Sequence, residues 1–387
     1  MKKKIIIILS TSTYDAEIQT NKQHITRCLD KLNRYRIIYI DQGFSLKYIK
    51  KKILEKDYLY FLWPFKKSGN NICVISPYFL LLLGNSLIKR ISWYILSKAI
   101  SLRFNKKQVI IWIYQPQGYY FLKYSNFLYG KTLYDCVDEF ITQPTYKNHP
   151  KRRRELRVIE PKLTKLVDYV TTTSYALYED KKKINSGIKY IHNVGDFKHF
   201  SNPNLNISIN EEWIKDNRLK VLYTGVLDNY KTDIELIIQI AELTKESHIY
   251  ILVGPNRIRD KELERRLRNM ENVSLLGYRN YELVPIYLYH ADLLWLPYLK
   301  SSHTDRVFPL KIFEYLASGK PVISTNLRSI QEYKEYVNFF QSISHLKDML
   351  HNVPISDTEH MKEVRIRIAS HNTWESRLKK ILDFIDE

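Results

Sequence analysis

The feature of this sequence that most restricts its fold is a regular alternation of nearly continuous apolar segments with helix-like stretches. Apolar segments of this kind, rich in Ile, Val and Leu, are typical of parallel strands that helices cover on both faces. The alternation runs through the chain twice and predicts two doubly wound α/β domains. In the first series we expect strands at Lys4–Leu9, Arg36–Ile40, Val109–Tyr114, Tyr169–Thr173 and Tyr190–Asn193.

The second series begins at Leu219, after a polar and Asn-rich segment. A chain of 387 residues is long enough for two domains of ordinary size. We therefore expect an amino-terminal domain at residues 1–200, a linker at 201–217 and a second domain at 218–370. A final helix at 371–387 is expected to pack back on the first domain.

The charge of the chain is distributed unevenly between its two halves. Residues 1–200 contain 36 Lys and Arg against 15 Asp and Glu, whereas residues 201–387 contain 25 against 26. The first half thus carries a formal charge of +21 and the second −1. This asymmetry indicates that one domain meets an anionic membrane or a polyanion while the other has a different task.

The cysteines and the apolar runs indicate the cellular compartment of the chain and whether it spans a membrane. Cys28, Cys73 and Cys136 are isolated and odd in number, which argues against a disulfide framework or a zinc site and favours a cytoplasmic location. The apolar run Ile5–Leu9 is too short for a signal peptide and reads as a buried strand. The stretch from Ile72 to Leu102 is interrupted by Gly and charged residues, so we expect no transmembrane segment.

From Leu87 onward, apolar residues alternate with Lys89, Arg90 and Lys98, and more basic residues follow. Two interpretations stay open, an ordinary amphipathic helix packed on a sheet and a helix that lies in a membrane interface. The basic run Lys151–Arg154 is either a solvated helix face or part of a surface that attracts acidic lipid or a diphosphate-linked acceptor.

The segment FPLKIFEYLASGKPVIS, residues 308–324, predicts a short helix followed by a strand, because Pro309 suits a first helical turn and Gly319 a helix end. Lys311 lies in the first turn, where the helix dipole disfavours a cation unless an anion binds there. Glu314 follows three residues later. The pair is either a surface ion pair or a site that binds a phosphate and a sugar hydroxyl side by side.

This helix resembles the donor-site helix of GT-B glycosyltransferases, and other strings agree with that family in the expected order. The chain is most similar to the cytoplasmic transferases of bacterial exopolysaccharide, capsule and teichuronic-acid assembly. The resemblance implies two Rossmann-like domains facing across a cleft, a nucleotide-sugar donor with a UDP-sugar favoured, and a glycan or polyprenyl-diphosphate-linked acceptor. It covers nearly the whole chain and includes LYDCVDEF, HNVGDFKHF, LYTG, ILVGP and NVSLLGY.

The resemblance also implies roles for individual residues of the donor site. Glu314 occupies the position of the glutamate that accepts hydrogen bonds from the donor's ribose hydroxyls, and Lys311 and Lys231 occupy positions that meet the diphosphate. Family members often have an Arg directly after the glycine at position 225, where this chain has Val226. Further residues expected at the donor nucleotide are Gly225, Gly277, Tyr278, Pro309 and Leu310.

The catalytic base is expected on the amino-terminal side. Many retaining members carry a second glutamate eight residues before the helix glutamate, but this chain has Arg306 there, which puts the retaining assignment in doubt. An inverting enzyme needs a carboxylate that takes the proton from the acceptor hydroxyl. We expect Asp138 in that role, with Glu139 second; the alternative is that Asp138 caps the next helix.

The sequence patterns around two asparagine/aspartate positions and two histidines are less specific. Asn193 and Asp196 resemble a hinge motif beside the cleft, with Val194 and Gly195 in swapped order. His192 and His199 are read as structural because no second ligand lies at a metal-like spacing. No Asp-X-Asp pair appears, so neither an obligatory metal nor another cofactor is expected.

Two alternatives from other classes remain beside a glycosyltransferase. The first is a catalytically silent protein of the same fold that scaffolds an assembly complex. The second is a nucleic-acid-binding protein, suggested by the basic charge and the 13% aromatic residues. No recognisable nucleic-acid module is present, and the aromatics lie in strands rather than among the basic residues, so we expect no nucleic-acid partner.

Overall fold

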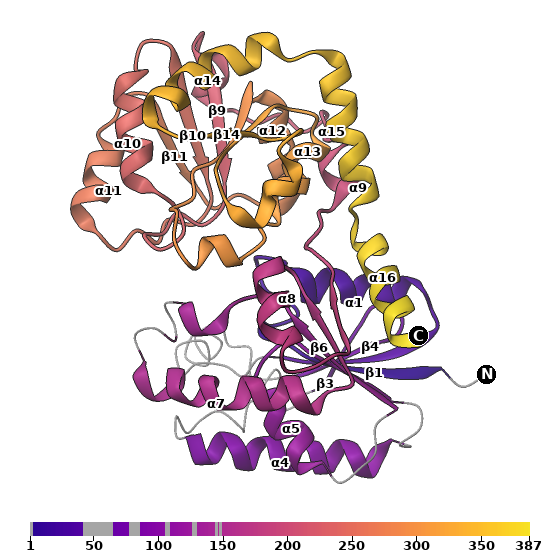
Figure 1. Cartoon of the computed structure of the whole chain (residues 1–387). Helices are drawn as coiled ribbons and strands as arrows, with labels where there is room; N and C mark the ends of the chain where they lie inside the picture. The colour runs from indigo at the N-terminus through magenta and orange to yellow at the C-terminus, as the bar shows by residue number, and fades with distance from the viewer. Residues whose placement is uncertain are drawn as a thin grey trace, which may run out of the picture. The chain divides into compact units, whose positions relative to one another are not determined.

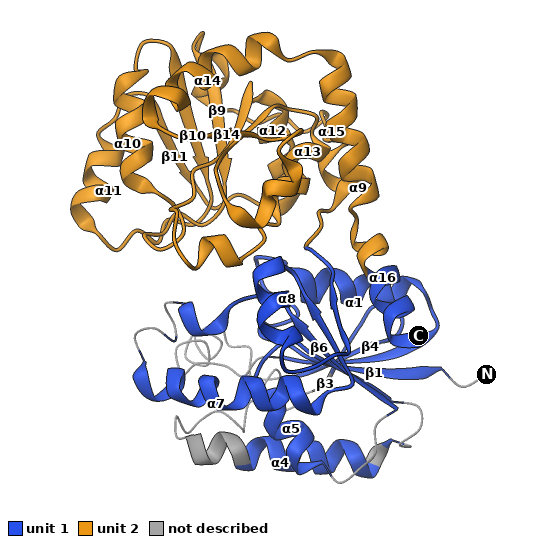
Figure 2. Cartoon of the chain, in the orientation of Figure 1, with its two compact units in different colours: residues 1–192, 378–387 blue, residues 193–377 orange. Residues whose placement is uncertain are grey.

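A computed structural model of the chain describes residues 3–41, 65–76, 86–104, 109–125, 130–143, 146 and 149–387. The chain forms two compact units (Figures 1 and 2), the first made of Met1–His192 and Leu378–Glu387 and the second of Asn193–Arg377. Each unit has its own sheet and its own hydrophobic core. Both are α/β units, as the alternation of apolar segments predicts.

Unit 1 is built on a sheet with the strand order β3-β4-β2-β1-β5-β6-β7-β8 in the described part of the chain. All neighbours pair in parallel except β3, which runs antiparallel to β4 at the sheet edge. Strands β2 and β5 flank β1 on opposite sides, so the strand order reverses there. The strands are β1 Lys4–Leu9, β2 Tyr35–Ile40, β3 Phe65–Ser68, β4 Ile72–Ile75, β5 Val109–Ile113, β6 Lys131–Cys136, β7 Tyr169–Thr172 and β8 Ile188–Tyr190.

Helices cover both faces of this sheet, which explains why its central strands are apolar on both sides. Residues 6–9 of β1 are fully buried. On one face, α4 packs Leu96 and Ile100 into the same core as Ile7 of β1 and Ile38 of β2. The helices of the unit are α1 Asn21–Lys31, α4 Ser86–Arg103, α5 Gly118–Tyr124, α7 Pro150–Leu166 and α8 Tyr175–Lys182, with the 3-10 turn η3 Phe140–Thr142.

Unit 2 contains a fully parallel sheet with the order β11-β10-β9-β12-β13-β14. The order reverses between β9 and β12, and ligands of such sheets bind beyond the carboxyl ends of the strands at this point. The strands are β9 Leu219–Thr224, β10 His248–Val253, β11 Val273–Gly277, β12 Leu293–Leu296, β13 Val322–Thr325 and β14 Asn338–Phe340.

The helices of unit 2 follow from amphipathic spacing and capping. In α10, Ile234, Ile237 and Ile238 are buried on one face, and the preceding Asp233 caps the helix by accepting from Leu236 N at 3.0 Å. The helices are α9 Phe197–Phe200, α10 Ile234–Leu243, α11 Lys261–Arg268, α12 Val284–His290, α13 Lys311–Ala317, α14 Ile343–Ser356 and α15 Glu359–His371; the 3-10 turns are η4 Glu212–Lys215, η5 Tyr281–Leu283, η6 Thr304–Arg306 and η7 Arg328–Tyr333. The last helix, α16 Trp374–Asp386, begins in unit 2 and continues into unit 1.

The boundary between the units differs from the one that composition suggested. The chain enters unit 2 at Asn193, so residues 201–217 lie inside this unit and do not link two domains. One residue attaches this polar segment to unit 2: Trp213 is buried and stacks on Tyr287 with ring centroids 6.2 Å apart. The chain returns to unit 1 within α16, where the ring of Phe384 packs edge-on against Tyr169.

The apolar stretch from Ile72 to Leu102 divides into different structures. Residues 72–75 form β4 and residues 86–103 form α4, whereas 77–85 lie outside the described residues. Lys89 and Arg90 belong to α4, but their side chains are also outside the described part. Among the described residues, no helix is both long enough and apolar enough to cross a membrane.

Candidate functional site

Three glycines mark the carboxyl edge of the unit 2 sheet, directly after or at the ends of neighbouring strands. Gly225 follows β9, Gly254 follows β10 and Gly277 ends β11, with φ values of 150°, 145° and 70° that favour glycine. Their backbones lie close together, because Gly225 N donates to Val253 O at 2.7 Å and Gly254 N donates to Gly277 O at 2.8 Å. A Cβ at Gly254 would collide with the carbonyl oxygen of Gly225, whereas one at Gly277 would meet nothing within 4 Å.

Helix α13 places Lys311 and Glu314 beside this edge. Lys311 Nζ lies 3.9 Å from Glu314 Oε2, and their side chains are 25% and 17% exposed. The stem of Lys311 runs along Gly225, since a Cβ built there would lie only 2.7 Å from Lys311 Cε. Tyr315 fixes the helix to the end of β9, because its hydroxyl accepts from Thr224 N at 2.8 Å.

A second lysine, Lys231, lies close enough to Lys311 to lower the pKa of its ammonium. Lys231 is in the loop between β9 and α10, where its backbone N–H donates to Asp228 Oδ1 at 2.8 Å. Its ammonium stands 5.1 Å from the centre of the Tyr298 ring. Burial lowers the pKa of Lys311; Glu314 opposes this shift and the charge of Lys231 adds to it. The two cations therefore repel each other beside Glu314, an arrangement that an anionic ligand would stabilise.

The carboxyl group of Glu314 is the acidic member of this cluster. Burial raises its pKa, while Lys311 and His199 lower it and Asp196 raises it further. Gly195 approaches the helix so closely that an added Cβ would lie 3.0 Å from Glu314 N. The segment that begins unit 2 thus forms one wall of the cluster.

Asn193 and Asp196 hold this segment in place. Asn193 is buried and donates from Nδ2 to Phe308 O at 2.9 Å, which ties the start of unit 2 to the chain just before α13. Asp196 caps the short helix α9 by accepting from His199 N at 3.3 Å. The ring of His199 stacks on Tyr281 with centroids 4.2 Å apart, consistent with a structural part.

The remaining residues expected at the donor lie around the same edge. Pro309 is buried and Leu310 is the N-cap residue of α13, which has no side-chain cap. Tyr278 follows Gly277 and its side chain is 47% exposed. Arg306, eight residues before Glu314, ends η6, and the adjacent Asp305 accepts from Arg328 N at 3.2 Å.

The residues expected to act as base lie in unit 1. Asp138 is half-buried after the end of β6, and its backbone carbonyl accepts from Cys136 Sγ at 3.6 Å. Within the described part of the chain its carboxylate makes no hydrogen bond or ion pair, and it does not cap η3, whose N-cap residue is Glu139. Glu139 Oε2 accepts from the Thr142 hydroxyl at 3.0 Å. The third carboxylate, Asp135, is buried and accepts from Thr171 at 2.9 Å.

A buried polar network supports the end of β6, the strand that precedes Asp138. Lys181 of α8 and Glu160 of α7 form an ion pair at 2.7 Å, and the Tyr134 hydroxyl donates to Glu160 Oε1 at 2.8 Å. Burial opposes the charge on Lys181, but the surrounding groups, Glu160 among them, raise the pKa of its ammonium. Burial raises the pKa of the Cys136 thiol to about 12, so this thiol stays protonated. The network joins both helices to the strand that carries Asp138.

The structure thus brings Lys231, Lys311 and Glu314 together with Gly225 in one unit and places Asp138 and Glu139 in the other. Two residues that shape the cluster were not among the site residues expected from the sequence, Gly254 and Gly195. The available signal for Gly254 is its place directly after an apolar run in ILVGP, as Gly225 follows one in LYTG. Gly195 had no such signal, because its importance comes from the approach of a helix more than 100 residues away.

Comparisons with known proteins agree with this architecture. Residues 218–378 match the profile of the family described as "Glycosyl transferases group 1". The chain is 26% identical over 290 residues to the putative teichuronic acid biosynthesis glycosyltransferase TuaH of Bacillus subtilis (strain 168), a match that covers 72% of each chain.

Solved structures share the fold over the whole chain. Sucrose-phosphate synthase from Thermosynechococcus elongatus has a TM-score of 0.72 at 14% identity and covers 99% of this chain and 98% of its own. Anabaena Alr3699/HepE in complex with UDP-glucose has a TM-score of 0.67 at 14% identity and covers 100% of both chains. The chain is therefore a glycosyltransferase with the GT-B fold, and its residues 218–378 are similar to the group 1 glycosyltransferases.

Proposed function

We propose that this glycosyltransferase moves a sugar from a UDP-sugar to a lipid-linked or growing glycan of a bacterial surface polysaccharide. The observation that carries the proposal is the cluster of Lys231, Lys311 and Glu314 beside the strand-end glycines of unit 2. The TuaH relative supports the acceptor class, and the HepE complex with UDP-glucose supports the donor class.

Each part of the cluster has the chemistry for one part of the donor. The carboxylate of Glu314 presents two oxygens that can accept from two vicinal ribose hydroxyls. Lys311 and Lys231 can bind the diphosphate, whose negative charge would relieve the repulsion between them. The open space in front of Gly277 lets a nucleobase approach the backbone there. Because the lysines supply positive charge at the diphosphate, we propose that the reaction needs no obligatory metal or other cofactor.

In the proposed reaction the acceptor hydroxyl oxygen attacks the anomeric carbon of the donor sugar. The bond from that carbon to the diphosphate oxygen breaks, UDP leaves with the electron pair, and the acceptor proton passes to Asp138. A carboxylate without a fixed partner among the described residues is available for this proton. Arg306 in place of a second donor-side glutamate favours inversion at the anomeric carbon.

The test of the donor site is the replacement of Glu314 by alanine. The variant should bind UDP more weakly by about 1–3 kcal/mol, because the ribose hydroxyls lose their acceptor in a half-buried site. Isothermal titration calorimetry with UDP measures this change as roughly a 5- to 150-fold rise in Kd. The matched control is Glu363→Ala on the exposed side of α15, which should leave Kd unchanged. Equal UDP affinity of wild type and Glu314→Ala would remove Glu314 from the donor site.

We also propose that unit 1 binds the inner, cytoplasmic face of an anionic membrane through α4. Ile91, Tyr94, Ile95 and Leu102 lie on one side of this helix and are 49%, 46%, 47% and 90% exposed. Lys98 lies on the same side, with Nζ 5.5 Å from the centre of the Tyr94 ring. Apolar side chains next to a basic residue are the pattern of a helix that rests in a lipid interface. The charge of +21 in the first 200 residues adds attraction to acidic lipids.

Replacing Ile91 and Ile95 by serine should weaken binding to vesicles of phosphatidylglycerol and phosphatidylcholine by about tenfold or more, because half-exposed apolar area would no longer enter lipid. Vesicle co-sedimentation measures the change, and the UDP affinity should not move. The control Leu205→Ser/Ile355→Ser removes two exposed apolar side chains from unit 2 and should leave vesicle binding intact. If the α4 variant binds vesicles as the wild type does, α4 is not the membrane contact.

A further inference from the structure

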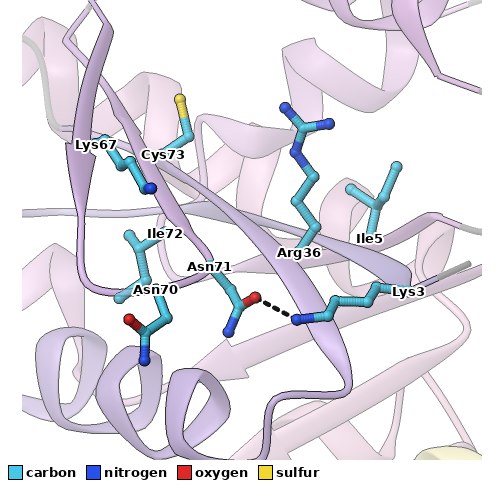
Figure 3. Close-up of a pocket in the computed structure, with 8 residues that line it drawn as sticks. All are labelled: Lys3, Ile5, Arg36, Lys67, Asn70, Asn71, Ile72 and Cys73. Atoms are coloured by element: carbon cyan, nitrogen blue, oxygen red, sulfur yellow. Dashed lines mark hydrogen bonds between the residues drawn. The ribbon is translucent and has the colours of Figure 1, made fainter.

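A cavity of about 630 Å³ opens at the amino ends of β1, β2 and β4 in unit 1. Its size is within the range of sites for small organic ligands. Three of its lining residues are cationic and two are asparagines, and two isoleucines and one cysteine complete the lining (Figure 3). The lining residues are Lys3, Ile5, Arg36, Lys67, Asn70, Asn71, Ile72 and Cys73.

The pairing of the strands gathers these cations on one face of the sheet. Ile5 of β1 pairs with Arg36 of β2, and Lys67 of β3 pairs with Cys73 of β4. Cys73 also pairs with Ile38, which is two residues from Arg36 and therefore on the same face. This is the face that α4 covers, since Ile38 and the partly buried Ile5 belong to the core that contains Leu96 of α4.

A network of polar contacts holds the rim of the cavity. Asp30 of α1 accepts from Asn71 N at 2.8 Å and from Asn70 N at 3.2 Å, which fixes the turn between β3 and β4. Asn71 in turn accepts from Lys3 Nζ at 2.5 Å, and Asn33 accepts from the same ammonium at 2.6 Å. The ammonium of Lys3 is thus positioned by two neutral amide oxygens, of which that of Asn71 is drawn in Figure 3.

Carboxylates do not neutralise the three cations within the part of the chain that the structure describes. Neither Lys3 nor Arg36 nor Lys67 forms an ion pair there, whereas the adjacent Lys66 pairs with Asp15 at 2.7 Å. Three like charges around one cavity, none of them in an ion pair, repel each other and would be stabilised by a bound anion.

We propose that this cavity binds a phosphate group of a ligand that also carries an apolar or ring portion. Arg36 offers a planar fork of donors that matches phosphate oxygens, and Lys3 and Lys67 add two further charged donors. Ile5, on the same face as Arg36, provides an apolar contact for the rest of the ligand. The phosphate belongs either to the headgroup of an anionic lipid, which the position on the α4 face favours, or to a soluble phosphorylated molecule.

The site is separate from the place of glycosyl transfer. Asp138 follows the carboxyl end of β6, whereas the cavity lies at the amino ends of parallel strands of the same sheet, on its opposite edge. The cluster around Glu314 belongs to the other unit. The proposal therefore adds a second ligand site and does not depend on the nucleotide that unit 2 binds.

Cys73 makes a local test possible, because it lines the cavity and is partly exposed while Cys28 and Cys136 are buried. The full chain is alkylated with neutral iodoacetamide at mildly alkaline pH, and modification of Cys73 is followed by mass spectrometry. The alkaline pH is needed because burial raises the pKa of the Cys73 thiol. Inorganic pyrophosphate at about ten times its Kd should slow the modification roughly tenfold, since the free site is then about one part in eleven. Sodium chloride of equal ionic strength should have no effect.

The decisive comparison uses two double variants with the same loss of charge. Arg36→Gln/Lys67→Gln removes two cations of the cavity and should weaken the protection by pyrophosphate at least about tenfold, as expected for lost charge-assisted hydrogen bonds. Arg34→Gln/Lys66→Gln changes residues that do not line the cavity and should keep the protection. The methyl resonances of Ile5 and Ile72 give a second readout that does not depend on thiol reactivity.

Two further probes separate the sources of the phosphate. Protection by vesicles of phosphatidylglycerol but not of phosphatidylcholine, without an effect of pyrophosphate, would support a lipid headgroup. Protection by pyrophosphate in solution would support a soluble ligand. The proposal is overturned if neither probe changes Cys73 modification or the isoleucine resonances, or if both double variants respond alike. UDP binding by unit 2 is measured separately. The phosphate site in unit 1 and the proposed donor site in unit 2 can therefore be contradicted independently of each other.

Discussion

The Lys181→Met variant should lose about 3–5 kcal/mol of unfolding free energy, because Glu160 would stay buried without its counter-charge. The two groups are 2.7 Å apart with side chains only 10% and 9% exposed, so water cannot replace the lysine. The Tyr134 hydroxyl and the Cys136 thiol would remain as neutral donors to Glu160 Oε1. Urea denaturation of the full chain measures the loss.

Two controls distinguish the buried pair from a general loss of charge. Lys182→Met removes the exposed neighbouring lysine, whose ammonium stands 5.3 Å from the centre of the Tyr178 ring, and should change stability little. Adding Glu160→Gln to Lys181→Met should recover part of the stability, because no isolated charge is then buried. If Lys181→Met and Lys182→Met have the same stability, the ion pair does not support the end of β6.

The Asp138→Asn variant should lower turnover by about 100-fold to 10,000-fold, as expected when a general base is removed. The amide cannot take the proton of the acceptor hydroxyl, so the attack on the anomeric carbon loses its driving force. UDP affinity should be unchanged, because Asp138 lies in unit 1, whereas the cluster around Glu314, for which we propose donor binding, lies in unit 2. The rate of UDP release from the bound UDP-sugar measures turnover, and calorimetry measures affinity.

Glu139→Gln is the matched control for this experiment, since it makes the same chemical change at the next residue. Its carboxylate already accepts from Thr142, which leaves it less available for a proton. We expect the Glu139→Gln rate to stay close to that of the wild type. A normal rate for Asp138→Asn together with a loss for Glu139→Gln would move the role to Glu139, and normal rates for both would place the base elsewhere.

Local sequence patterns were sufficient for much of the fold. The strand expected at Lys4–Leu9 is β1 with the same limits, and the strand expected at Tyr169–Thr173 is one residue longer than β7. Both are short segments rich in β-branched residues, and this length and composition favour a strand over a helix. The β3–β4 hairpin was not expected, because four-residue strands at a sheet edge carry too little pattern to be recognised.

The domain boundary could not be read from composition for a different reason. Residues 201–217 are polar enough to suggest a linker, but the burial of Trp213 against Tyr287 attaches them to unit 2. A single aromatic residue such as Trp213 changes the average composition of this segment little, although its burial can hold an irregular backbone in place. Such long-range contacts become visible only in the folded chain.

In the candidate site, too, some features follow from local sequence and others become visible only in the folded chain. Lys311 and Glu314 are three residues apart on one helix, so their proximity follows from helix geometry alone. The proximity of Lys231 to Lys311 required the resemblance to a family, since about 80 residues separate them in the chain. The packing of Gly195 on α13 and of Gly254 on Gly225 depends on backbone approach, which no side-chain pattern encodes.

The central claim is that the cluster around Glu314 in unit 2 binds the donor nucleotide. The most direct measurement is a thermal-shift panel of UDP, GDP, ADP, CMP and dTDP with the wild type and Glu314→Ala. We predict that UDP stabilises the wild type by about 2.7 kcal/mol at 100 times its Kd, and that this gain is lost or strongly reduced in the variant. Equal stabilisation of both proteins, or no stabilisation by any of the five nucleotides, would contradict the claim and would favour a protein that keeps the fold of a transferase without its chemistry.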